Sequence, residues 1–470
     1  MILADIIPQY NGIRHITELL PLRSSAGRKR MLSQTFMTKA KDIKEELDKV
    51  EEMYGFLLNP QFEKPITAIQ QTLMQIHDIQ NSLNALVQKH IMDEIELFEI
   101  KRFALLCEEI ATQLDTLSCQ YIAVPDLNKV IELLDPESNR TAHFFIYSAY
   151  DPLLAEARRQ YKALEGEQSD EAQLLREQCL NLEDSIRQRL SKNLHSHSSD
   201  LMQAWEAVAT LDFTLARAGL ALESGLVRPH IASDITQYEG LFHPGIKEIL
   251  QKRNQRFHPW DIQLFDAPCL ITGANMAGKT VLLKTIALNQ YLLQFGFFVA
   301  AAKADIVPVD VIRTAFDDEQ SELTGLSSFA AEIVRLQSVL STIKEGKKML
   351  VLIDEPARTT NPHEGLAIAN ALIDLLEKHR VRSLITTHYS KIQSSCRKLR
   401  IKGLKIPETI SAITIDTINR YMDYSLMEHR SNEAPREAIQ IARLLGLDEE
   451  LISLARFYAG RNETEIEPST

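Results

Sequence analysis

The chain has 470 residues, of which 45% are hydrophobic and 25% charged, and 52 Lys and Arg against 64 Asp and Glu leave a formal net charge of −12. These ordinary values exclude bulk disorder and a fibrous chain, and the length predicts two to four domains. The acidic balance excludes a protein that coats nucleic acid or an anionic membrane with its whole surface, while a local basic groove remains open.

The cysteines and the apolar runs indicate a compartment. Five cysteines lie far apart and form no C-x-x-C pair, a pattern typical of reduced, intracellular proteins. The chain begins with no basic and then apolar leader, and no apolar run reaches the length of a membrane span. We therefore expect a cytoplasmic protein with no membrane partner.

Residues 1–225 are predicted to form an all-helical domain. Neither proline nor glycine occurs between Pro65 and Pro125, and apolar residues recur every three or four positions from Ile66 to Leu86. This spacing predicts long helices.

Residues 151–200 are rich in Glu, Gln, Arg and Leu and have two interpretations. We favour one or two solvated helices with opposite charges one turn apart. The alternative is a projecting antiparallel pair that turns near Gly166 or near residues 193–200. His195 and His197 do not favour a metal site, since no Cys or further His lies at ligand spacing.

After about residue 226, short apolar runs alternate with helical segments. The predicted strands are 268–272, 349–353, 383–387 and a pair at 410–415 and 421–427, and the predicted helices include 280–295 and 364–380. This alternation predicts an α/β domain over residues 226–434, with a largely parallel sheet covered on both faces.

A phosphate-binding loop lies between a predicted strand and a predicted helix. Residues 273–280 read G-x-x-x-x-G-K-T, with Gly273, Gly278, Lys279 and Thr280 at the defining positions. Glycines let backbone N–H groups surround the β-phosphate, the lysine reaches the β- and γ-phosphates, and the threonine hydroxyl binds Mg²⁺. The loop therefore predicts ATP and Mg²⁺ as ligands.

Polar residues end two further predicted strands. Asp354 and Glu355 follow strand 349–353, where Asp354 is expected to orient Mg²⁺ and Glu355 to polarise the attacking water. The alternative, an acidic strand end that only caps the next segment, is less favoured beside a phosphate loop. His388 follows strand 383–387 and is predicted to sense the γ-phosphate, although a lone histidine is more often structural.

Four segments together resemble the ATPase domain of the MutS mismatch-repair family. They are residues 272–280, which include Asn275 and Met276 in the phosphate loop, and residues 325–332, 354–360 and 386–389. Their order and spacing follow the family, and the Asn-Met pair and the serine-rich turn before Phe329 are more specific than a phosphate loop alone.

The resemblance implies an ABC-type P-loop ATPase in which two nucleotides are bound between two subunits. Ser327 would then reach the γ-phosphate held by the partner subunit, so that hydrolysis requires a homodimer or a paralogous heterodimer. Phe257 matches the stretch that packs against adenine in the family. Residues 435–470 resemble the family's helix-turn-helix, which joins subunits and does not read DNA.

The chain departs from the family pattern at several positions. Ala277, Ala357 and Thr359 stand where the family has glycines, which bears on the hydrolysis rate and the mobility of loop 354–360. None of the 17 phenylalanines is followed by x-Glu, the mismatch-reading wedge. Residues 151–222 resemble the family's lever helices, with too little sequence between them for a DNA clamp. We expect a core, lever and ATPase architecture without the mismatch-recognition, connector and clamp domains.

Two functions follow from the resemblance. The favoured one is an ATPase whose dimer closure remodels a protein partner, for example to reactivate an adenosylcobalamin-dependent aminomutase, as some short members of the family are thought to do. The alternative is a DNA-binding ATPase that acts on duplex or branched DNA in mismatch repair or recombination.

Overall fold

The computed structural model describes residues 1–140, 144–164, 169–273, 278–316, 328–389, 392–404, 421–429 and 438–464. The chain divides into two compact units, which are treated separately. The first comprises Met1–Ile6, Leu19–Thr35 and Glu46–Leu222, and the second comprises Ile7–Glu18, Phe36–Glu45 and Glu223–Thr470. The prediction of a single boundary near residue 225 did not anticipate that two short N-terminal segments cluster with the second unit. A separate domain at 435–470 stays a prediction.

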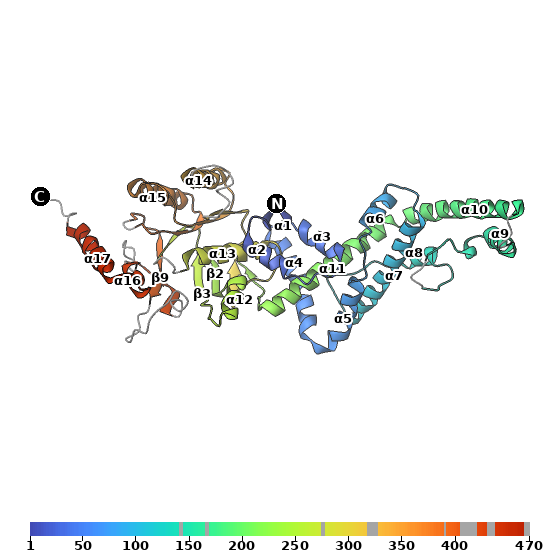
Figure 1. Ribbon diagram of the computed structural model, residues 1–470, viewed down its shortest axis with the longest axis horizontal. Coiled ribbons are helices and arrows are strands. Elements are labelled where there is room, and N and C mark those ends of the chain that lie inside the picture. Colours follow the sequence, from blue (N-terminus) through green and yellow to red (C-terminus); the bar gives the residue numbers. More distant parts are fainter. Residues whose placement is uncertain are drawn as a thin grey trace. The chain divides into compact units, whose positions relative to one another are not determined.

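Helices build the first unit (Figure 1). Their bounds are Leu3–Ile6 (α1), Ser25–Ser33 (α3), Ala40–Leu58 (α4, whose first residues cluster with the second unit), Pro60–Phe62 (η1), Glu63–Leu73 (α5), Gln80–Val87 (α6), Glu94–Leu117 (α7), Asn128–Leu134 (α8), Ser148–Tyr150 (η2), Pro152–Ala163 (α9), Asp170–His195 (α10) and Ser198–Ser224 (α11).

Local side-chain chemistry sets the ends of α7. The Asp93 carboxylate accepts from the backbone N–H of Glu96 (2.8 Å), and the Glu96 carboxylate accepts from that of Asp93 (2.9 Å). This reciprocal pair satisfies two N–H groups that the helix cannot bond internally. The left-handed backbone of Ser118 (φ 54°) ends the helix.

The apolar periodicity from Ile66 to Leu86 is divided between α5 and α6, where a longer helix was predicted. Asp78 lies in the break, accepts from the backbone N–H of Gln80 (3.3 Å) and pairs with Lys29 (2.7 Å). A short acidic side chain that bonds nearby backbone competes with helix formation. Ile76 and Ile79 remain buried in the break, so burial continues while the helix does not.

Helices α9 and α10 combine features of both interpretations of residues 151–200. They pack against each other, with Arg158 of α9 paired to Glu183 of α10 (2.6 Å). Leu174 and Leu180 of α10 are nevertheless exposed. Gly166, where the turn was predicted, lies outside the described residues.

The second unit contains both helices and strands (Figure 1). Their bounds are Asn11–Glu18 (α2), His230–Ile231 (β1), Thr236–Leu241 (β2), Pro244–Lys252 (α12), Trp260–Leu264 (β3), Pro268–Thr272 (β4), Lys279–Gln294 (α13), Lys303–Ile306 (β5), Val311–Ala315 (β6), Ser328–Lys344 (α14), Met349–Ile353 (β7), Pro362–Lys378 (α15), Arg382–Thr386 (β8), Arg397–Leu404 (β9), Met422–Glu428 (β10), Ala438–Leu444 (α16) and Glu449–Thr464 (α17).

The described strands of this unit form two sheets. The larger has six strands in the order β10-β9-β4-β8-β7-β6, with β10 antiparallel to β9 and all other neighbours parallel. The smaller has four strands in the order β1-β5-β2-β3. The largely parallel sheet agrees with the prediction, whereas the smaller sheet and β9 were not predicted. Residues 410–415, a predicted strand, lie outside the described residues, and β10 pairs with β9 instead.

Helices cover both faces of the six-stranded sheet. Val351 and Ile353 of β7 share an apolar cluster with Leu336 of α14 and Leu372 of α15. Side chains alternate between faces along a strand, so Leu350 and Leu352 serve the face on which α13 contacts β7 and β8. Figure 1 shows α14 and α15 on one side of the sheet and α13 on the other. Because neighbouring strands from β9 to β6 are parallel, their carboxyl ends lie at one edge of the sheet.

In the described parts of both units, no helix is long and apolar enough to cross a membrane.

Candidate functional site

Three parallel strands carry the predicted site residues to the same edge of the sheet. Strand β4 leads into Gly273, β7 into Asp354 and β8 into His388, and β8 lies between the other two. Because parallel strands share their direction, residues far apart in the chain meet at this edge.

Asp354 lies between two threonine hydroxyls. Thr280, the second residue of α13, donates to Asp354 Oδ2 at 2.6 Å, and Thr386 at the end of β8 donates to Asp354 Oδ1 at 2.5 Å. The structure thus brings together Thr280 and Asp354, the two predicted Mg²⁺ residues. Thr386 was not predicted as a site residue, although it lies in the Thr-Thr-His run that was noted.

Carboxylate and hydroxyl oxygens are the hard donors that Mg²⁺ prefers, and the pair of Thr280 and Asp354 fits this ion. Across the ranges that the structure describes, no three His, Cys, Asp or Glu side chains gather in a metal-binding group. A magnesium ion held here would take its other ligands from phosphate and water, as is usual in nucleotide sites.

Lys279 holds its amine inside the site. Only 6% of its side chain is exposed, and Nζ donates to the carbonyl of Gly273 (2.9 Å) and lies 3.3 Å from Glu355 Oε1. A buried ammonium needs such partners, because burial removes its hydration. A phosphate entering the loop would meet this amine at the start of α13, where the backbone N–H groups also favour an anion.

Glu355 has three cationic or basic neighbours. Besides Lys279, its carboxylate lies 3.5 Å from Arg358 and 3.8 Å from His388 Nδ1. Desolvation lowers the pKa of His388 below its usual value, while the charge of Glu355 acts to raise it. His388 is therefore neutral at pH 7 and able to accept or donate a hydrogen bond at the sheet edge.

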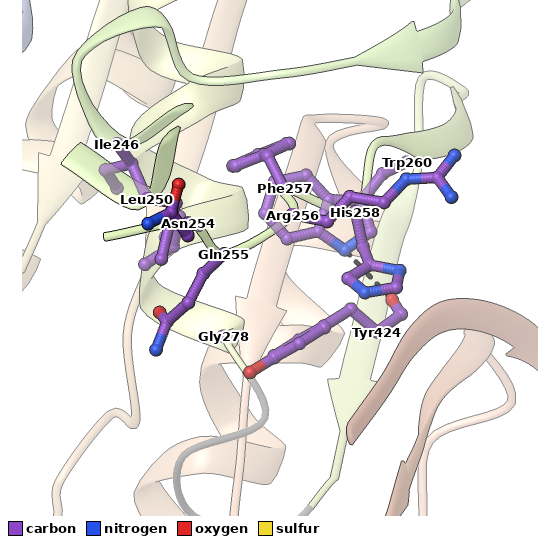
Figure 2. Close-up of a pocket in the computed structure, with 11 residues that line it drawn as sticks. Ile246, Leu250, Asn254, Gln255, Arg256, Phe257, His258, Trp260, Gly278 and Tyr424 are labelled. Atoms are coloured by element: carbon purple, nitrogen blue, oxygen red, sulfur yellow. Dashed lines mark hydrogen bonds between the residues drawn. The ribbon is translucent and has the colours of Figure 1, made fainter. Parts of the chain in front are cut away.

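A cavity of about 500 Å³ adjoins the phosphate loop at Gly278. Figure 2 shows Ile246 and Leu250 of α12 on one side and Tyr424 of β10 on the other. Phe257 also lines the cavity, and its ring lies 5.3 Å from that of Trp260 in an edge-on arrangement. Apolar and aromatic walls beside a phosphate loop suit a flat heterocyclic base.

Tyr424 was missed by sequence reasoning, although residues 421–427 were predicted as a strand. Its ring packs so close to Gly278 that a Cβ added there would lie 3.3 Å from Tyr424 Cδ1, and Gly278 has a left-handed φ of 79°. The Trp260 indole N–H donates to the Tyr424 carbonyl (3.0 Å). Trp260 and Tyr424 are brought to the cavity by tertiary contacts, which no local sequence pattern reveals.

Other predicted site residues fall outside this geometry. Asn275, Met276 and Ser327, together with Ala277, lie outside the described residues. His195 and His197, which the sequence did not favour as a metal site, lie in the first unit. His195 Nε2 is 3.2 Å from the His90 carbonyl, and His197 Nδ1 is 3.7 Å from the Asp200 carboxylate.

Known proteins to which this chain is similar carry the name MutS or MutS2. Residues 269–461 match MutS domain V, the ATPase domain of that family. The chain is 34% identical over 291 residues to the DNA mismatch repair protein MutS of Rhodopseudomonas palustris (strain BisA53), covering 60% of this chain and 31% of that protein. It is 29% identical over 286 residues to Endonuclease MutS2 of Carboxydothermus hydrogenoformans, covering 60% of this chain and 34% of that protein. The chain thus spans about a third of the length of these relatives.

Proposed function

We propose that this chain, of which residues 269–461 match MutS domain V, is a member of the MutS family that binds Mg²⁺-ATP and hydrolyses it at the edge of the six-stranded sheet. One observation carries this proposal: the phosphate loop contacts the carboxylates that follow β7. Lys279 Nζ lies 3.3 Å from Glu355, and the Thr280 hydroxyl donates to Asp354 at 2.6 Å. The alternative, in which Asp354 and Glu355 only cap the next segment, does not account for a buried lysine between a phosphate loop and a carboxylate.

Each residue then has a defined task. The adenine occupies the cavity of Phe257 and Tyr424, and Lys279 binds the phosphates. Thr280 and Asp354 would hold Mg²⁺, which would supply positive charge that neutralises the phosphate oxygens. Glu355 accepts a hydrogen bond from the attacking water and polarises it, and neutral His388 beside it contacts the terminal phosphate. Gly273 and Gly278 would contact the phosphates, and the resemblance to the family assigns Asn275 and Met276 to the same loop.

We further propose that the active species is a dimer, since members of the MutS family function as dimers. Ser327 of one subunit would complete the ATP site of the other. Helices α16 and α17 would form the helix-turn-helix that joins the subunits. Support for this comes from large apolar side chains that α17 leaves exposed, namely Leu451, Leu454, Phe457 and Tyr458. The dimer is either a homodimer or a pair of paralogues.

A protein partner is the favoured target of the ATP cycle, with an adenosylcobalamin-dependent aminomutase as the example. Two observations support it. The net charge of −12 opposes nonspecific binding to phosphates, and only Ser196 and His197 separate α10 from α11, which leaves no room there for an inserted DNA clamp. The names of the relatives favour the alternative, an ATPase that acts on duplex or branched DNA in repair or recombination.

Two assays distinguish these targets. Affinity for duplex, mismatched and branched DNA is measured with and without ATP at two salt concentrations, and we expect weak binding. In parallel, a purified aminomutase whose cofactor is damaged is incubated with this protein and ATP, and we expect activity to return with the wild type and not with Glu355→Gln. Tight DNA binding that falls steeply with salt would transfer the proposal to the DNA alternative.

The composite site is tested with mixed dimers. A Ser327→Arg subunit and a Lys279→Ala subunit are each expected to be inactive as homodimers. Their mixture contains one intact composite site, so part of the ATPase activity should return. No recovery in verified heterodimers would show that Ser327 does not act across the interface.

A further inference from the structure

The loop after β7 holds two residues in a backbone conformation that glycine normally adopts. Glu355 has φ 47° and Ala357 has φ 58°, both in the left-handed region that residues with a Cβ rarely enter. Such a conformation persists only where surrounding contacts impose it. Because Glu355 is the proposed water-polarising carboxylate, the contacts that hold this loop also set the position of its carboxylate.

Two side chains from other elements bond the peptide groups of Ala357. The carboxylate of Glu332, on α14, accepts from the Ala357 N–H through Oε1 and from the Thr359 hydroxyl through Oε2 (3.2 Å). The hydroxyl of Tyr389, just after β8, donates to the Ala357 carbonyl (2.7 Å). Ala357 is fully buried, so water does not replace these bonds if they are lost.

Helix α15 packs tightly against the hydrogen bond between Tyr389 and Ala357. A Cβ added to Gly365 of α15 would lie 2.1 Å from the Tyr389 hydroxyl oxygen and 2.7 Å from the Ala357 carbonyl oxygen. Thr359, one of the departures from the family's glycines, supplies a hydroxyl that glycine lacks. The loop is therefore fastened by contacts that depend on the particular residues of this chain.

Glu332 belongs to the helix that begins at Ser328, directly after Ser327 in the sequence. We propose that Glu332 is a positioning residue that holds Glu355 in its working place and ties the loop after β7 to α14, with Tyr389 as the second anchor. The proposal rests on the proposed ATPase function.

The two acceptor oxygens of Glu332 define a graded set of variants. An ionised glutamate only accepts, which suits the Ala357 N–H and the Thr359 hydroxyl at once. In Glu332→Gln, the amide oxygen still accepts from Ala357, and the amide N–H₂ donates to the Thr359 hydroxyl oxygen. Glu332→Ala loses both bonds, and Tyr389→Phe loses one. Gln337→Ala changes an exposed position of the same helix and serves as the matched control.

Steady-state ATPase measurements test the positioning role. Glu332→Ala should lower kcat on the order of 10- to 100-fold, the usual effect of a misplaced catalytic group. It should leave the dissociation constant of ATP within about twofold, since Glu332 touches neither Lys279 nor the base cavity. Glu332→Gln should retain most of the rate, Tyr389→Phe should fall between them, and Gln337→Ala should match the wild type. A wild-type kcat in Glu332→Ala, or an equal loss in Glu332→Gln, would overturn the proposal.

Hydrogen exchange of the Ala357 amide tests, without nucleotide, whether Glu332 holds the loop after β7. In Glu332→Ala its exchange should accelerate by about tenfold or more, while the amides of β7 stay protected. This measurement separates two failures. If the wild type hydrolyses no ATP and the exchange rate of the Ala357 amide still depends on Glu332, the proposed function is wrong, but the role of Glu332 in holding the loop stands. If ATP turns over normally and the exchange rate of the Ala357 amide is the same in all variants, Glu332 does not hold the loop, and the proposed function stands.

Discussion

Tyr424→Ala isolates the contribution of the base cavity to nucleotide binding. The ring of Tyr424 forms one wall of the 500 Å³ cavity beside Gly278. The Trp260 indole bonds the main-chain carbonyl of Tyr424, so the substitution keeps that hydrogen bond and removes only the ring. Loss of one stacking face costs about 1–3 kcal/mol when the ring stacks on a base. A loss of about 2 kcal/mol raises the dissociation constant of ATP by roughly 30-fold.

Calorimetric titration with ATP and with tripolyphosphate gives the decisive comparison. Tyr424→Ala should weaken ATP binding and leave tripolyphosphate binding unchanged, because only ATP carries a base. Tyr424→Phe keeps the ring and should bind ATP nearly as the wild type does, whereas Lys279→Ala should lose both ligands. The reasoning fails if Tyr424→Ala binds ATP with wild-type affinity, or if its affinity for tripolyphosphate falls by the same factor.

Three further predictions concern the metal, the histidine and the helical unit. Asp354→Ala removes the carboxylate between Thr280 and Thr386, so Mg²⁺ should no longer strengthen ATP binding relative to EDTA; a persistent Mg²⁺ effect would place the ion elsewhere. Burial lowers the pKa of His388 below its usual value, while the charge of Glu355 acts to raise it. Glu355→Gln should therefore lower this pKa further in an NMR titration, and a rise would contradict this electrostatic account. In Gly27→Ala the new Cβ would lie 2.2 Å from Asp212 Oδ2, whereas at Gly55 a Cβ meets nothing within 4 Å. Denaturant unfolding should show a loss of about 1–3 kcal/mol for Gly27→Ala and none for Gly55→Ala, and equal stabilities would refute it.

The edge of the sheet that carries the proposed site was largely predictable from the sequence. Gly273, Lys279, Asp354 and His388 each follow or begin an element whose apolar pattern is plain, and parallel strands necessarily bring such ends together. The length of the pattern also indicated α13 and α15 to within a few residues. At these positions the prediction rested on a local apolar pattern that is followed or preceded by a polar residue or a glycine.

Contacts between distant segments were not predictable in the same way. Tyr424 and Trp260 are separated by 164 residues, and nothing in either local pattern indicates the other. Glu332 reads as an ordinary polar residue of an amphipathic helix until the left-handed loop at Ala357 is seen. Strand β9 alternates charged and apolar residues, and only its pairing with β4 and β10 shows that it lies inside the sheet. Asp78, which lies in the break between α5 and α6, pairs with Lys29, and that residue is far away in the chain.

The most direct test of the central claim is a paired measurement of ATP binding and single-turnover hydrolysis for the wild type, Lys279→Ala and Glu355→Gln. The account predicts that the wild type binds and hydrolyses ATP, that Lys279→Ala does not bind it, and that Glu355→Gln binds it with little change in affinity but hydrolyses it at least about 100-fold more slowly. Hydrolysis by Glu355→Gln at the wild-type rate, or unaltered binding by Lys279→Ala, would contradict the account.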